Sequence, residues 1–80
     1  MISGQVWIVD YDLPSNPTRI RVAFYRAVRK ALKDLGIEHW EFSTASVVVV
    51  DDEAIARTIH IIAKQYGKSN LYRGFNVPDA

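Results

Sequence analysis

The stretch QVWIVDYDLP at residues 5–14 decides the fold, because it marks one strand and the point where that strand ends. β-Branched and aromatic residues dominate its first part, which is typical of a β-strand over residues 5–11. The run DLPSNP at residues 12–17 then ends the strand, since proline cannot donate to a ladder of backbone hydrogen bonds. Ser15 or Asn16 can cap a following helix, and Pro17 is tolerated in its first turn.

An amphipathic helix follows this strand. Apolar residues recur at three- and four-residue steps from Ile20 to Leu35, which predicts one buried face, and Gly36 supplies a stop. Between Leu13 and Lys33 there are six basic residues and no acidic ones, a charge of +6. The basic residues are Arg19, Arg21, Arg26, Arg29, Lys30 and Lys33. The rest of the chain has four basic and nine acidic residues, a charge of −5, and such asymmetry indicates a polyanionic partner.

The remainder of the chain predicts two strands, a helix and a last strand. Residues 37–43 favour a strand and the valine run at 46–50 predicts one more strongly, so we expect two antiparallel strands rather than one bent strand. The sequence DDE at residues 51–53 supplies a cap and negative charge for a second helix, which ends at Gly67. Residues 70–77 alternate as a final strand.

The predicted order is therefore strand, helix, strand, strand, helix, strand, within one domain over residues 1–80. Right-handed crossovers give an α+β ferredoxin-like sandwich: a four-stranded antiparallel sheet with both helices on one face. Trp7, Trp40 and the valines are expected near the other face, which favours a partner subunit as its cover. So short a chain buries only ~60% of its unfolded surface and this one has no cysteine, so we expect a homodimer.

Several classes of protein are disfavoured. No apolar run reaches the ~20 residues of a membrane-spanning helix, and the start lacks the pattern of a signal peptide, so a cytoplasmic protein without membrane partners is expected. The four glycines match no phosphate-binding loop. His39 and His60 have no ligand spacing, and a packed or partly exposed role is expected for His60.

Asp10 and Asp12 are the candidate metal ligands. They lie two residues apart on a strand, so both side chains point to one face, with α-carbons ~6.5–7 Å apart. Two carboxylates can hold Mg²⁺, which could activate water and offset charge on a scissile phosphate. The alternative is structural: Asp12 forms a turn before Leu13-Pro14, and Asp10 pairs with a nearby arginine.

The basic residues of the first helix are the candidate nucleic-acid contacts. Arg19, Arg26, Lys30 and Lys33 fall near one helical stripe, while Arg21, Tyr25 and Arg29 form another. Together the two stripes would span ~20 Å along the helix axis. Arginine forks match phosphate oxygens, which suits backbone binding without sequence reading. The alternative is a solvated outer face.

These residues resemble a known family. The segment VDYDLP at 9–14, followed by Arg19 and Arg21 at a helix start, resembles the opening of CRISPR-associated protein two. Ser46-Val47 is similar to the family's Ser-Val-Phe strand, and the segment at 70–73 is similar to its final strand. The order of elements agrees over nearly the whole chain, whereas specific motif matches are confined to about residues 6–21.

The resemblance implies a ferredoxin-like homodimer that acts in CRISPR-based antiviral defence, binds double-stranded DNA and bridges integrase subunits. It also implies a metal-dependent endonuclease activity on RNA or DNA, as described for some members. In that reading Asp12 is the catalytic strand-end aspartate that holds Mg²⁺, and Arg19 and Arg21 contact the nucleic-acid backbone. The loop after Asp12 lacks the family's further acidic residues, and Val48-Val49 replaces an aromatic and an acidic residue. The virulence-associated protein D ribonucleases are a nearby alternative.

Two other classes of function stay open. A non-enzymatic interaction module would use the basic helix to bind an acidic protein, with Asp12 only shaping a turn. A small regulatory domain of ferredoxin-like type would bind a metabolite between subunits, for which the chain offers no pocket signature.

Overall fold

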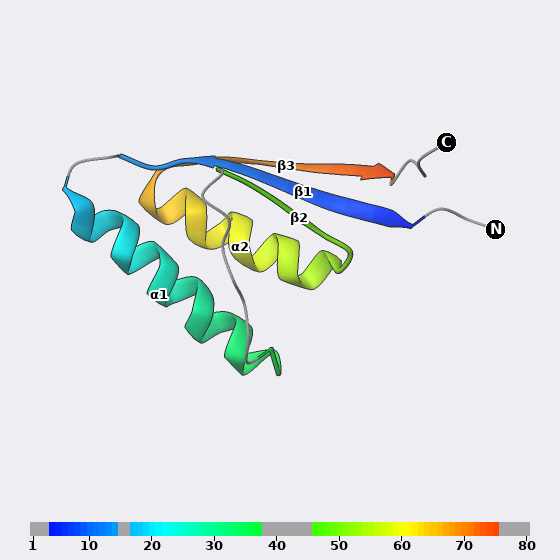
Figure 1. Cartoon of the computed structure of the whole chain (residues 1–80), viewed down its shortest axis with the longest axis horizontal. Helices are drawn as coiled ribbons and strands as arrows, with labels where there is room; N and C mark the ends of the chain where they lie inside the picture. Colours follow the sequence, from blue (N-terminus) through cyan, green and yellow to red (C-terminus); the bar gives the residue numbers. More distant parts are fainter. Residues whose placement is uncertain (1–3, 15–16, 38–45, 76–80) are drawn as a thin grey trace.

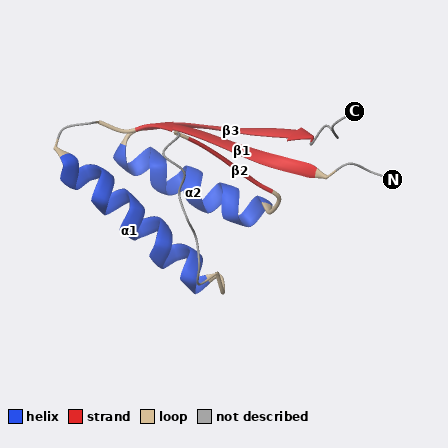
Figure 2. Cartoon of the chain, in the orientation of Figure 1, coloured by secondary structure: helices blue, strands red, loops and turns tan. Residues whose placement is uncertain are grey.

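The computed structural model describes residues 4–14, 17–37 and 46–75, and these form a small α+β domain (Figures 1 and 2). Three antiparallel strands stand in the order β2-β1-β3, with β1 in the centre. The five elements are β1 (Gln5–Asp12), α1 (Thr18–Asp34), β2 (Val47–Val50), α2 (Glu53–Tyr66) and β3 (Lys68–Phe75).

Both helices lie on one side of the sheet (Figure 1). α2 packs against all three strands, and α1 packs against α2. α1 reaches the sheet through Phe24, whose ring centroid lies 4.9 Å from that of Tyr11 on β1. The free side of the sheet faces away from both helices (Figure 1).

The predicted elements are confirmed wherever the chain is described, with shifts of one or two residues at their ends. The last strand is the exception in length, because it begins at Lys68 directly after Gly67 and not at Asn70. The strand predicted near residues 37–43 lies almost wholly outside the described residues, so the described sheet has three strands where four were expected. Both helices on one face of an antiparallel sheet were predicted correctly.

Alternate residues of β1 define the two faces of the sheet. Val9 and Tyr11 are buried on the helix side, so Ile8, Asp10 and Asp12 point to the open side. Trp7 shares the helix side with Val9 and packs against the core. The expectation that Trp7 lies near the open face was therefore wrong, because the strand's period of two assigns it to the other face. Trp40 lies outside the described residues.

The helix ends show which capping predictions hold. The Asp52 side chain accepts hydrogen bonds from the backbone N–H groups of Ala54 (2.8 Å) and Ile55 (3.2 Å), so the predicted cap of α2 is confirmed. α1 begins after Pro17 without a side-chain cap, and the expected capping residues 15 and 16 lie outside the described part. Gly36 has a φ of 88°, a left-handed conformation that favours glycine just after α1.

The core is a single apolar cluster between the sheet and the two helices. Its five largest fully buried side chains are Phe24, Leu32, Ile59, Val9 and Val28. Three of these come from one face of α1, which leaves the rest of that helix surface free for polar side chains.

Replacing Gly67 by alanine is expected to destabilise the fold by about 1–3 kcal/mol. An alanine Cβ at this position would clash with the backbone oxygen of Asp12, and backbone cannot move aside as a flexible side chain can. Urea unfolding followed by circular dichroism measures the loss. Gly4→Ala is the matched control, because an added Cβ meets nothing within 4 Å there. Equal unfolding midpoints for the two variants would contradict the close approach of Gly67 to β1.

Candidate functional site

All six predicted basic residues of α1 are exposed. Phe24, Val28 and Leu32 bury the opposite face of the helix, so the charges and the core divide its surface between them. The absence of acidic residues holds along α1 up to its last residue, Asp34. The helix therefore presents unneutralised positive charge along nearly its full length.

Four of these residues form a stripe, as predicted. Arg19, Arg26 and Lys33 recur every seven residues, which is close to two helical turns or ~10.5 Å, and Lys30 lies between the last two. We call these four residues the α1 stripe. It extends over ~21 Å of a straight helix, a length over which a phosphate backbone offers several charges.

Arg21 lies apart from the α1 stripe, on the side of α1 that faces β1. It is close enough to Tyr11 to act on the phenol electrostatically. The pKa of Tyr11 is raised to about 12, first by burial and then by Tyr25, while Arg21 opposes the rise. Tyr11 therefore stays neutral at physiological pH and joins β1 to α1.

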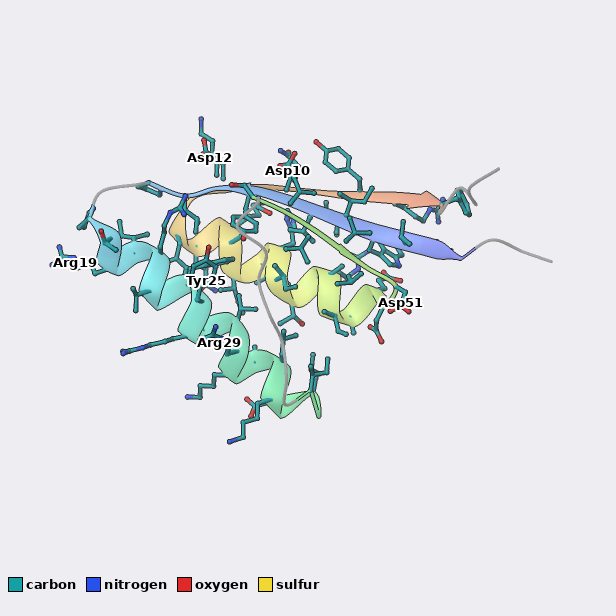
Figure 3. All side chains as sticks on the ribbon, viewed as in Figure 1. Asp10, Asp12, Arg19, Tyr25, Arg29 and Asp51 are labelled. Atoms are coloured by element: carbon teal, nitrogen blue, oxygen red, sulfur yellow. The ribbon has the colours of Figure 1, made fainter. Side chains whose placement is uncertain are left out.

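Asp10 and Asp12 share the open face of the sheet, as their spacing predicted (Figure 3). The Asn70 side-chain amide donates a hydrogen bond of 3.0 Å to Asp10 Oδ1. Asp10 thus pairs with an amide of β3, whereas an arginine partner was the structural alternative. Asp12 is exposed and stands opposite Lys68 in the register of β1 and β3.

The carboxylates and the α1 stripe lie on different sides of the molecule. Figure 3 shows Asp10 and Asp12 on the side of the sheet away from the helices, and Arg19 and Arg29 on α1 in the helix layer. The sequence brings Asp12 close to the start of α1, but the fold turns the two groups in different directions. A single phosphate is thus not held jointly by Asp12 and the α1 stripe.

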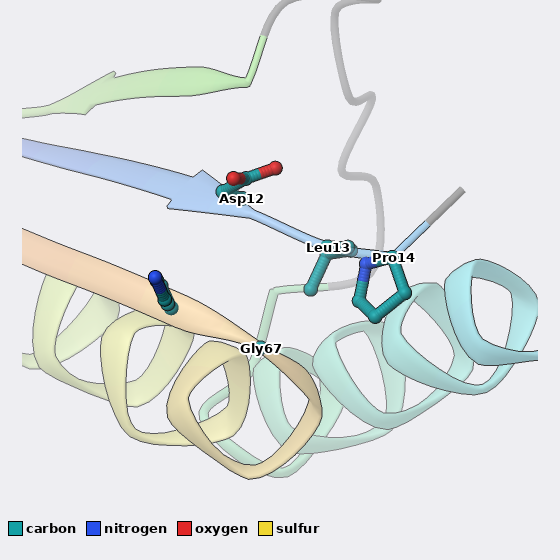
Figure 4. A pocket seen from close by; sticks show the side chains of 5 residues that line it. Asp12, Leu13, Pro14 and Gly67 are labelled. Carbon is teal, nitrogen blue, oxygen red and sulfur yellow. The ribbon is translucent and has the colours of Figure 1, made fainter. Parts of the chain in front are cut away.

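A shallow cavity of about 260 Å³ lies beside Asp12 (Figure 4). Its lining residues are Asp12, Leu13, Pro14, Gly67 and Lys68. It is slightly smaller than the ~300 Å³ at which small-molecule pockets usually begin. Asp12 and Lys68, two of these lining residues, lie on adjacent strands and are paired in the register of the sheet.

The described residues offer Mg²⁺ a small set of ligands. No group of three or more His, Cys, Asp or Glu side chains is gathered in the described ranges. Asp10 and Asp12 match the one or two carboxylates through which Mg²⁺ usually binds beside substrate phosphate. One oxygen of Asp10 is engaged by Asn70, so Asp12 is the freer ligand of the two.

His60 on α2 is partly buried, as predicted, and its Nδ1 lies 2.8 Å from Ser69 Oγ on β3. The pKa of His60 is lowered by burial first, and then by Lys64 and Arg57. His39 lies outside the described residues.

Sequence reasoning missed Lys68 and Asn70 as neighbours of the two aspartates. Strand register decides which residues meet across a sheet, and register follows from the whole packed face and not from one strand. The sequence signal for these neighbours was the alternation at Lys68, Asn70 and Tyr72. These three side chains lie on one face of the sheet when β3 begins at Lys68.

Comparison with known proteins gave no match to a family model, a curated protein or a solved structure. Within the described residues, no helix is long and apolar enough to cross a membrane.

Proposed function

We propose that this chain is a nucleic-acid-binding protein that contacts the sugar–phosphate backbone through α1. The observation that carries the proposal is the exposure of six cationic side chains on one helix with no acidic residue among them. Arginine and lysine contacts to phosphate give affinity and position without reading bases. The biological role that we propose for this activity is that of CRISPR-associated protein two, in which the protein bridges integrase subunits on DNA.

A salt titration tests the proposal. Fluorescence anisotropy with labelled 20-base-pair DNA and RNA duplexes should show affinity that falls steeply with salt. Four phosphate contacts on B-DNA give a slope of log affinity against log salt of about −3.6, and six give about −5.4. Affinity too weak to measure at 20 mM salt for both duplexes would reject the proposal and favour a protein partner for α1.

The fold and assembly that we propose are a ferredoxin-like sandwich and a homodimer. The order β2-β1-β3 supports the fold, because it matches three of the four strands of that arrangement. The open sheet face supports the dimer, since Val47, Val49 and Tyr72 on it are 44%, 57% and 49% exposed. Sedimentation equilibrium should then give twice the chain mass of 9.1 kDa.

We further propose Asp12 as the main ligand of a catalytic Mg²⁺, with Asp10 beside it. The metal, when bound, would supply a water of lowered pKa and charge compensation for a scissile phosphate. The role of the protein would be to present the Asp12 carboxylate on the open face of the sheet. Asp12 is paired with Lys68 of β3 in the register of the sheet, which holds this end of β1 in place.

Asp12→Asn separates cleavage from binding. The variant should lose about 100-fold or more of any Mg²⁺-dependent cleavage, because a metal's charge stabilisation is worth several kcal/mol. Duplex affinity measured in EDTA should change less than threefold, because Asp12 lies away from the α1 stripe. Asp51→Asn is the matched control, an exposed aspartate in the turn between β2 and α2. Absence of Mg²⁺-dependent cleavage by the wild type would reject the enzymatic half and leave a binding adaptor.

A further inference from the structure

α2 has two different sides. It packs against α1 and against all three strands, β3 among them. Tyr66 faces α1, where its ring centroid lies 6.3 Å from that of Phe24. The side toward β3 carries Arg57, His60 and Lys64, which fall within about 60° of one another around the helix axis.

β3 adds a further cation to the same side. The contact between His60 and Ser69 shows that this side of α2 meets the helix-facing side of β3. Arg73 lies four residues after Ser69 and therefore on the same strand face. Arg73 is paired with Trp7 of β1 in the register of the sheet. The guanidinium carbon of Arg57 lies 5.9 Å from the centroid of the Trp7 ring. We call Arg57, His60, Lys64 and Arg73 the α2–β3 flank.

The α2–β3 flank has more positive than negative charge. Arg57 forms an ion pair with Glu53 at 2.6 Å. Lys64 and Arg73 are exposed and form no ion pair with the described residues. The cations that act on His60 are Lys64 and Arg57 from α2. Arg73 lies farther along β3, on the same strand face as Ser69, and is paired with the uncharged Trp7 of β1. The pKa of His60 is lowered by burial first and then by the positive charges of Lys64 and Arg57, and no carboxylate is among the groups that shift it.

We propose that the α2–β3 flank is a second phosphate-contact surface, which binds a nucleic-acid backbone separately from α1. Lys64 and Arg73 supply exposed charge, and the imidazole of His60 lies on the same side of α2 as Lys64. A backbone phosphate beside Lys64 and His60 offsets the positive field on the imidazole and favours protonation of His60, while Arg73 contacts a phosphate farther along the backbone. This inference extends the proposed function, because it gives one chain two backbone-binding sides with α2 between them.

The ionisation of His60 provides the main test. The imidazole proton signal of His60 is assigned by its loss in His60→Gln, and its pKa is measured free and with saturating 20-base-pair DNA. We expect a rise of about 0.5–1 pKa unit on binding, because a phosphate replaces an uncompensated positive field. Inorganic pyrophosphate is titrated in parallel as a small phosphate probe. A rise with pyrophosphate but none with DNA would overturn the assignment to nucleic acid.

Paired variants test the same surface without relying on the titration. Lys64→Gln/Arg73→Gln should lower the salt slope of DNA binding by about 1.8 and remove most of the His60 pKa rise. Arg26→Gln/Lys30→Gln is the matched pair on α1: it should lower the slope by the same amount but leave the His60 pKa rise intact. An unchanged slope in the flank variant, together with an unmoved His60 pKa, would overturn the inference. The proposed function has its own test, because it is rejected if the wild-type protein binds no duplex at all. In that event the pyrophosphate titration still tests whether the α2–β3 flank binds phosphate.

Discussion

Replacing the α1 stripe by Arg19→Gln, Arg26→Gln, Lys30→Gln and Lys33→Gln should weaken duplex binding by roughly 10²- to 10³-fold at 0.15 M salt. Each neutralised phosphate contact contributes about 0.9 to the salt slope, so the slope should fall by about 3.6. Extrapolated from 1 M salt, that slope corresponds to a factor near 10³. Anisotropy titrations from 50 to 400 mM salt measure both quantities.

The controls separate charge from helix stability. Glutamine has a helix propensity close to that of lysine and arginine, so α1 should keep its structure, which circular dichroism checks. A second variant, Arg19→Lys/Arg26→Lys, keeps the charge and loses the planar fork. It should retain the wild-type slope with a modest loss of affinity. A quadruple variant that kept the wild-type slope would show that nucleic acid is held elsewhere.

Much of the fold could be predicted because local signals agree with the packing. The strand 5–11, the apolar face of α1 and the cap at Asp52 follow from composition and period within a few neighbouring residues, and all three are confirmed. The start of β3 was missed because the strand begins at Lys68, directly after Gly67 ends α2. To predict the earlier start of β3, one would have had to know that Gly67 lies close to the backbone of β1.

The candidate site was less accessible to sequence reasoning than the fold. The shared face of Asp10 and Asp12 follows from the strand period, and the exposure of the α1 stripe follows from the helical period. The direction in which each group faces depends on the layer order of the whole domain. A short loop between β1 and α1 made the aspartates and arginines look like neighbours, whereas the sheet turns the aspartates away from the helices.

Phe24→Ala should destabilise the domain by about 3–5 kcal/mol. The Phe24 side chain is fully buried, and its ring lies 4.9 Å from Tyr11, 5.4 Å from Tyr25 and 6.3 Å from Tyr66 between centroids. Deleting it removes apolar contact and leaves a cavity between α1, β1 and α2. A domain of 80 residues has a free energy of unfolding of only about 4–12 kcal/mol, so much of the stability would go. With an m-value of ~1 kcal/mol/M, the urea midpoint should fall by about 3 M or more.

Val22→Ala is the matched control, because Val22 lies on the same helix and is 43% exposed. It should change stability by about 0.5 kcal/mol or less. A Phe24→Ala loss as small as that of Val22→Ala would contradict the packing of α1 onto the core. The result also bears on binding, because Phe24 joins α1 to both β1 and α2. If the α1 stripe is the nucleic-acid surface, affinity should fall in step with the folded fraction of Phe24→Ala, whereas the quadruple Gln variant should lose affinity while folded. The buried face of α1 would thus determine whether the charged face can act.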